Sequence, residues 1–219
     1  MTCDALLATK VHLPAARPNL AARGRLIAHL MDGLRQGHRL TLVSAPPGFG
    51  KTTLIRQWVG VAGRRVAWLT LDEGDNDARR FVRYLLAALG QADEGGGPAW
   101  LDVPPDAPPE ELLIGLLNAL TSAGSDLLLV LDDYHLIRDF DVHNLVAFLL
   151  THQPPQLHLV IGTREDPPLP LARLRARGQL SEVRELALRF TLEEAGVFFA
   201  ETMGLSLSCL LYTSDAADD

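Results

Sequence analysis

Eight residues in the first quarter of the chain, APPGFGKT at Ala45 to Thr52, restrict the fold more than any other feature of the sequence. They follow an apolar run at 39–44 and precede a run with helical periodicity at 51–61, so we expect a strand, a tight loop and a helix in that order. A glycine-rich loop in this context is typical of phosphate binding. Taken alone, the loop fits either a phosphate site or an ordinary turn rich in glycine and proline.

The positions of this loop have separate expected roles. Gly48 and Gly50 allow backbone conformations that other residues avoid, so that successive N–H groups can converge on phosphate oxygens. We expect Lys51 to neutralise the β and γ phosphates and Thr52 to offer its hydroxyl to Mg²⁺. Ala45 departs from the usual pattern, which begins with glycine. The residues predicted to bind the nucleotide in this stretch are Ala45, Pro46, Pro47, Gly48, Phe49, Gly50, Lys51, Thr52 and Thr53.

Two adjacent aspartates end an apolar run later in the chain. Residues 127–131 read LLLVL, which is typical of a strand buried on both faces, and Asp132 and Asp133 follow. We expect Asp132 to hold Mg²⁺ through water and Asp133 to orient or deprotonate an attacking water. The alternative is an acidic pair that merely starts a loop. Both motifs together, in order and each on its own strand, indicate a P-loop NTPase that uses ATP or ADP with Mg²⁺.

Arg164 and His135 follow these motifs in the sequence, and each has an expected role. Arg164 follows the apolar run at 157–163, where its side chain could reach the γ-phosphate and report its loss. A solvated surface charge is the alternative for this arginine. His135, just after the aspartate pair, is expected to be a hydrogen-bonding loop residue rather than a metal ligand, because no other histidine or cysteine lies at metal-type spacing.

The rest of the sequence alternates short apolar runs with segments of helical periodicity. Strands are predicted at 39–44, 65–71, 127–131, 157–163 and 183–188, and helices at 23–36, 51–61, 78–89, 110–120, 141–151 and 191–203. Thr191 and Glu194 have the spacing of a capping box at the start of the last helix. This alternation predicts a three-layer α/β fold with a mainly parallel, five-stranded sheet.

Composition limits the setting in which the chain works. The formal net charge is -7, which argues against a free-standing nucleic-acid-binding surface. The sequence has no signal-peptide pattern and no apolar stretch of membrane-spanning length, and its two cysteines have no metal-type spacing. We therefore expect a cytoplasmic protein without membrane contact.

Three longer strings add a family resemblance: LDEGDN at 71–76, LDDYHLI at 131–137 and REDPPLPLARLRARG at 164–178. With them, residues 10–208 closely resemble the nucleotide-binding domain of MalT-like, large ATP-binding regulators of the LuxR family, which belong to the STAND class of NTPases. The resemblance implies an ASCE-type sheet, in which the strand at 157–163 lies between the other two motif strands. It implies that Arg164 is a sensor and that Arg23 helps to hold the adenine side.

The same resemblance implies partners and a working cycle. ADP would keep the protein closed, ATP and a small-molecule or protein inducer would open it for self-association, and slow hydrolysis would reset it. DNA and the inducer would bind to domains outside this sequence. The alternative is a P-loop ATPase module of another signalling or metabolic protein that has no DNA-binding domain.

We expect four parts along the chain. Residues 1–38 would form an amino-terminal segment and a helix that flanks the adenine site, 39–190 the NTPase core, and 191–208 the start of a following helical region. Residues 209–219 resemble one reading frame of a sequencing adapter translated by mistake, so they are left out of the predicted fold. An acidic, disordered tail is the alternative for these last residues.

Overall fold

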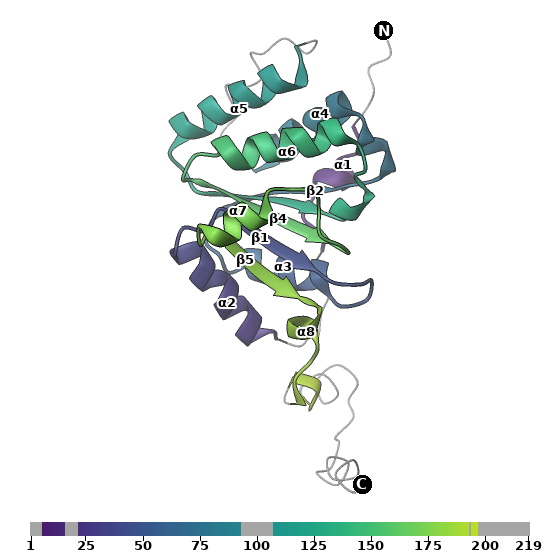
Figure 1. The fold of residues 1–219 in the computed structure, drawn as a ribbon, viewed down its shortest axis with the longest axis vertical. Coiled ribbons are helices and arrows are strands. Elements are labelled where there is room, and N and C mark those ends of the chain that lie inside the picture. The colour runs from purple at the N-terminus through teal and green to yellow at the C-terminus, as the bar shows by residue number, and fades with distance from the viewer. Residues whose placement is uncertain (1–5, 16–21, 93–106, 193, 197–219) are drawn as a thin grey trace, which may run out of the picture.

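A five-stranded parallel sheet forms the centre of the computed structural model, which describes residues 6–15, 22–92, 107–192 and 194–196 (Figure 1). The strands are β1 (Leu40–Ser44), β2 (Arg65–Thr70), β3 (Leu127–Asp132), β4 (Leu157–Thr163) and β5 (Leu180–Arg184). Their order in the sheet is β2-β3-β4-β1-β5, and all four pairings are parallel. The prediction that β4 lies between β1 and β3 is therefore confirmed.

Helices cover both faces of this sheet. The helices are α1 (Ala8–Val11), α2 (Gly24–Arg35), α3 (Lys51–Val59), α4 (Ala78–Gln91), α5 (Pro109–Ala123), α6 (Phe140–His152), α7 (Leu171–Ala176) and α8 (Glu185–Leu188), with 3-10 turns η1 (Glu73–Asn76) and η3 (Tyr134–Leu136). Figure 1 shows α4, α5 and α6 on one side of the sheet and α2 and α3 on the other. The predicted three-layer α/β architecture is confirmed.

Side chains of the central strands alternate between two apolar cores. Leu42 and Leu129 belong to the core beneath α4, α5 and α6, whereas their neighbours Val43 and Val130 pack with α2 and α3. Because both faces are covered, these strands are apolar at nearly every position. Trp58 of α3 is completely buried in the second core.

The carboxyl-terminal part of the fold differs from the predicted strand at 183–188. The strand β5 begins three residues earlier, and residues 185–188 form α8 instead. The predicted capping box is confirmed, because Thr191 N donates to Glu194 Oε2 at 3.0 Å and Glu194 N donates to Thr191 Oγ1 at 3.2 Å. The rest of the helix predicted to reach residue 203, and the segment 209–219, lie outside the described residues.

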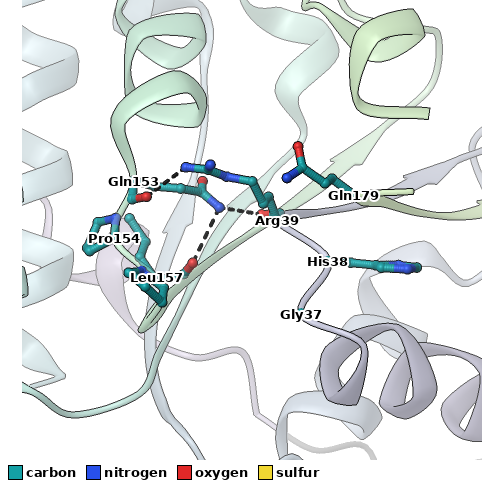
Figure 2. Close-up of a pocket in the computed structure, with 8 residues that line it drawn as sticks. Gly37, His38, Arg39, Gln153, Pro154, Leu157 and Gln179 are labelled. Carbon is teal, nitrogen blue, oxygen red and sulfur yellow. Dashed lines mark hydrogen bonds between the residues drawn. The ribbon is translucent and has the colours of Figure 1, made fainter. Parts of the chain in front are cut away.

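A cavity of about 300 Å³ lies where the amino ends of β1, β4 and β5 meet (Figure 2). Arg39 Nη2 donates to the backbone oxygen of Gln153 at 2.7 Å, and Gln153 Nε2 donates to the backbone oxygens of Arg39 at 2.8 Å and Leu157 at 3.3 Å. Gln153 is the C-cap of α6, so the guanidinium neutralises the negative end of that helix. These bonds fasten α6 to the sheet, at the end opposite the phosphate loop.

No helix in the described part of the chain is both long enough and apolar enough to cross a membrane.

Candidate nucleotide-binding site

The loop between β1 and α3 has the backbone expected of a phosphate loop. Gly48 has φ +86° and Gly50 has φ +77°, in the left-handed region that favours glycine. Gly50 is the N-cap of α3, and no side chain caps this helix end. The first N–H groups of α3 are therefore available to phosphate oxygens, and the helix dipole favours an anion there. The predicted backbone conformation is confirmed, whereas phosphate binding by these residues stays a prediction.

Lys51 is folded back onto this loop. Its Nζ donates to the backbone oxygens of Ala45 at 2.7 Å and Pro46 at 3.0 Å, and the residue is 8% exposed. Burial lowers the pKa of the Lys51 ammonium, and the positive charge of Arg164 lowers it further, while the two aspartates of the second motif oppose the shift. The ammonium is thus a compact positive charge beside the uncapped helix end.

A hydrogen bond joins the two sequence motifs. Thr52 Oγ1 donates to Asp132 Oδ2 at 2.7 Å, and Asp133 N donates to Asp132 Oδ1 at 3.1 Å. Burial raises the pKa of Asp132, which is 2% exposed, and the bond from Thr52 opposes that shift. A hydroxyl and a carboxylate are hard oxygen ligands, so this pair fits Mg²⁺ that completes its shell with water and phosphate. Within the described residues, no three His, Cys, Asp or Glu side chains gather as a metal cluster of their own.

Asp133 has an unusual backbone conformation. Its φ is +58°, and no other described residue except glycine has a positive φ. Strained backbone of this kind costs free energy and is concentrated at functional sites. The 3-10 turn η3 follows directly, with Leu136 N donating to the backbone oxygen of Asp133 at 3.1 Å. The turn directs the chain away from β3 and leaves the Asp133 side chain 40% exposed.

His135 lies in the same turn, and the expectation that it forms hydrogen bonds in the loop is wrong. Its side chain is 9% exposed, and neither ring nitrogen has a hydrogen-bond partner among the described residues. The closest carboxylate oxygen, on Asp133, lies 3.9 Å from Nδ1. Burial lowers the pKa of His135, and the charge of Arg164 lowers it further. A neutral imidazole whose ring nitrogens have no hydrogen-bond partner among the described residues therefore lies beside Asp133.

Arg164 lies at the end of β4 and is exposed. Thr163 is buried, and its Oγ1 donates to the backbone oxygen of Glu165 at 2.8 Å, which shapes the turn that carries the arginine. No carboxylate lies within 4.0 Å of Arg164 in the described part of the protein, and its charge is close enough to lower the pKa of both Lys51 and His135. A free guanidinium therefore lies near the site, as a sensor requires, although the sensor role stays a prediction.

A second cavity, of about 430 Å³, continues from the phosphate loop. We call it the base pocket. It is lined by Arg23, Pro47, Gly48, Phe49, Leu188, Arg189 and Phe190. Apolar walls of this kind suit a flat aromatic base. Arg23 was expected on the adenine side and does line this cavity, but contact with a base stays a prediction.

Asn76 connects the string at 71–76 to the turn after β3, a role that no sequence pattern revealed. Its Nδ2 donates to the backbone oxygens of Glu73 and Leu136, both at 2.9 Å. Its Oδ1 accepts from Arg138 N at 2.6 Å and Asp139 N at 2.9 Å. One amide side chain therefore joins the 3-10 turn η1 to residues 136–139, the later part of the segment that begins with Asp133.

The predicted site residues thus divide into two groups. Lys51, Thr52, Asp132 and Asp133 lie together at the carboxyl ends of β1 and β3, with Arg164 nearby. Arg23 and the loop residues Pro47 to Phe49 line the adjacent base pocket. Of the remaining predicted residues, Ala45 is buried, Pro46 and Gly50 are exposed, and Thr53 is half-buried in the first turn of α3.

The parallel sheet, the phosphate loop and the acidic strand end define a P-loop NTPase. The chain belongs to the family of AAA ATPase domains, whose model matches residues 19–161. Membership of this family implies that the chain binds a nucleotide. The chain is also 41% identical over 199 residues to the HTH-type transcriptional regulator MalT of Cronobacter sakazakii, which covers 89% of this chain and 22% of that protein. MalT of Klebsiella pneumoniae is 38% identical over 218 residues, which is 98% of this chain and 23% of that relative.

The chain therefore spans less than a quarter of the length of these relatives. Solved structures support the fold at lower identity. A signal transduction ATPase with numerous domains (STAND) from Pyrococcus horikoshii, with a tetratricopeptide repeat sensor, is 14% identical with a TM-score of 0.62 over 87% of this chain and 26% of its own. A Walker-type ATPase of Pyrococcus abyssi is 14% identical, with a TM-score of 0.56 over 89% of this chain and 62% of its own.

Proposed function

We propose that this chain is the ATP-binding switch module of a MalT-type transcriptional regulator. Identity near 40% to proteins named as MalT regulators supports the type of regulator. The observation that carries the nucleotide assignment is the 2.7 Å hydrogen bond between Thr52 and Asp132, which brings the phosphate loop and the acidic strand end into one site. Domains beyond this sequence would supply the contacts to DNA and to an inducer.

In this proposal, the phosphates of ATP or ADP lie at the uncapped amino end of α3. The N–H groups that follow Gly48 and Gly50 would donate to phosphate oxygens, and Lys51 would exchange its bonds to loop carbonyls for the β and γ phosphates. Thr52 and Asp132 would hold Mg²⁺, which supplies positive charge to the phosphates. The base would lie in the base pocket against Phe49.

Hydrolysis would depend on the residues around the η3 turn. Asp133 is the carboxylate that can orient or deprotonate a water, because Asp132 is committed to Thr52 and to the amide of Asp133. His135 offers two unused ring nitrogens beside it. Arg164 would contact the γ-phosphate and lose that contact after hydrolysis. Slow turnover of this kind would let the bound nucleotide set whether the protein is closed or able to self-associate.

The metal site gives a direct test of this proposal. In the wild-type chain, we expect Mg²⁺ to raise the affinity for ADP and ATP, measured by titration calorimetry with and without the ion. Asp132→Asn removes the metal-binding charge, so the dependence on Mg²⁺ should disappear while metal-free binding persists. Asp126→Asn, on the surface beside Arg64, is the matched control. Undiminished Mg²⁺ dependence in Asp132→Asn would exclude this carboxylate as the metal ligand.

A further inference from the structure

A buried arginine connects the wall of the base pocket to the chain that follows the sheet. Arg23 Nη2 donates to the backbone oxygen of Leu188 at 2.6 Å and to that of Arg189 at 3.4 Å. Its Nε lies 3.3 Å from Glu194 Oε1, and its guanidinium lies 4.5 Å from the centre of the Phe190 ring. These partners are Leu188, Arg189, Phe190 and Glu194, so one side chain fastens four residues that follow β5 to the amino end of α2.

The same segment forms one wall of the base pocket. The phosphate-loop residues 47–49 line this cavity and are called the first wall, and Leu188, Arg189 and Phe190 also line it and are called the second wall. A flat base in this cavity would contact the first wall, which belongs to the phosphate loop, and the second wall, which Arg23 holds in place. Phosphate groups bound at Lys51 would contact the phosphate loop and would not contact the second wall.

Glu194 determines how firmly the second wall is held. The side chain of Arg23 is 8% exposed and that of Glu194 is 12% exposed, so the two charges are largely removed from water. Burial lowers the pKa of Arg23, and Glu194 opposes that shift. Glu194 Oε2 also accepts from Thr191 N at 3.0 Å, so each carboxylate oxygen has a defined partner. Neutralising Glu194 would leave a buried cation without its carboxylate, which is unfavourable.

We propose that Arg23 and Glu194 form a latch that couples occupation of the base pocket to the position of residues 188–192. This inference rests on the proposed nucleotide site and names how that site communicates with the residues that follow β5 and α8. A base that contacts the second wall stabilises the closed latch. Because coupling is reciprocal, the closed latch raises the affinity for the base by the same factor. The coupling depends on the nucleoside and not on the phosphates.

Binding measurements separate these contributions. The full chain is titrated with Mg-ADP and with magnesium pyrophosphate, as wild type, Glu194→Gln and Glu185→Gln. The last variant is the matched control, because Glu185 at the start of α8 pairs with Arg189 at 2.8 Å and has no ion pair with Arg23 among the described residues. We expect Glu194→Gln to weaken ADP about 5-fold or more and to leave pyrophosphate unchanged. Equal affinity for ADP in wild type and Glu194→Gln, or an equal loss for both ligands, overturns the latch.

Hydrogen exchange gives a second readout that a purely structural role would not produce. In wild type, ADP should slow amide exchange at residues 188–192, and pyrophosphate should not. In Glu194→Gln, ADP should no longer slow it. Identical protection by the two ligands contradicts the latch, even if both bind. Failure of the wild-type chain to bind either ligand would instead remove the proposed function, and the latch with it.

Discussion

At the scale of single residues, the site depends on a contact between motifs that lie 80 residues apart. Thr52 reaches Asp132 because Gly162, at the end of the intervening strand β4, has no side chain. A Cβ at position 162 would lie 2.4 Å from Asp132 Oδ1, which is closer than atoms tolerate. Strand β4 therefore contributes to the proposed metal-binding pair, because its Gly162 leaves room for the Asp132 side chain.

The same scale separates the roles of the two aspartates. Because Asp133 does not bond to Thr52, we expect Asp133→Asn to retain nucleotide binding and to reduce ATP hydrolysis by about 100-fold or more, the usual contribution of a general base. Single-turnover hydrolysis and ADP titration measure the two properties separately. Asp141→Asn, exposed in the first turn of α6, is the control. An unchanged rate in Asp133→Asn would remove this carboxylate from the mechanism.

At the scale of elements, two short 3-10 turns are held together by Asn76. Its amide bonds η1 to the segment that follows Asp133, and that segment also contains His135. The turn that follows Asp133, the proposed general base, is therefore held by a residue that follows β2, on the far side of β3 from the phosphate loop.

We expect Asn76→Ala to lower the rate of ATP hydrolysis by about 10-fold while changing nucleotide affinity little, because misplacing a reacting group mainly affects the chemical step. Asn76→Asp keeps the oxygen that accepts from Arg138 N and Asp139 N, so it should be less impaired. The rate constant and the dissociation constant are measured on the same preparations. A rate in Asn76→Ala equal to wild type would show that the turn is positioned without this amide.

The pairing of β1 with β4 makes stability depend on pH. His158 is 1% exposed, its Nδ1–H donates to the backbone oxygen of His38 at 2.7 Å, and its Nε2 accepts from Thr41 Oγ1 at 2.8 Å. Burial lowers the pKa of His158 to about 4. The folded protein thus keeps the ring neutral while the unfolded chain binds a proton near pH 6.5. This contribution to stability is complete above about pH 6.5 and is lost as the pH falls toward 4.

Urea unfolding at two pH values measures this effect. Between about pH 7.5 and pH 5, we expect His158 to account for a loss of about 2 kcal/mol in the free energy of unfolding. His158→Gln should show a smaller loss over the same interval, even though the variant is less stable at neutral pH. His29→Gln, on the exposed side of α2, should follow the wild type. A pH dependence of His158→Gln as steep as that of the wild type would contradict this origin.

Most elements could be predicted from sequence because their signals are local. Continuous apolar runs marked the covered strands, and the spacing of glycine, lysine and threonine marked the phosphate loop. The edge strand β5 gave a weaker signal, since only Ser181 and Val183 are fully buried in it and its other positions are partly exposed. The environment of His135 and the partners of Arg23 and Asn76 depend on contacts between distant segments, which periodicity and spacing do not report.

At the scale of the whole molecule, the predicted phosphate site and the base pocket lie at the same end of the sheet. Leu188, Arg189 and Phe190 line the base pocket, and Arg23 contacts these residues and Glu194. At the opposite end of the sheet, hydrogen bonds between Arg39 and Gln153 hold the end of α6 against β1. If the proposed latch is right, a bound nucleotide acts on this end of the molecule and not on the opposite one.

Titration calorimetry of the full chain with Mg-ATP tests the central claim most directly. We expect saturable binding by the wild type and a loss of at least about 100-fold in affinity in Lys51→Ala, because a charge-assisted contact to phosphate is removed. Arg35→Ala, which removes an exposed cation of α2 paired with Asp32, should bind like the wild type. Equal affinity of Lys51→Ala and the wild type for Mg-ATP, with both proteins folded, would contradict the assignment of the phosphate loop.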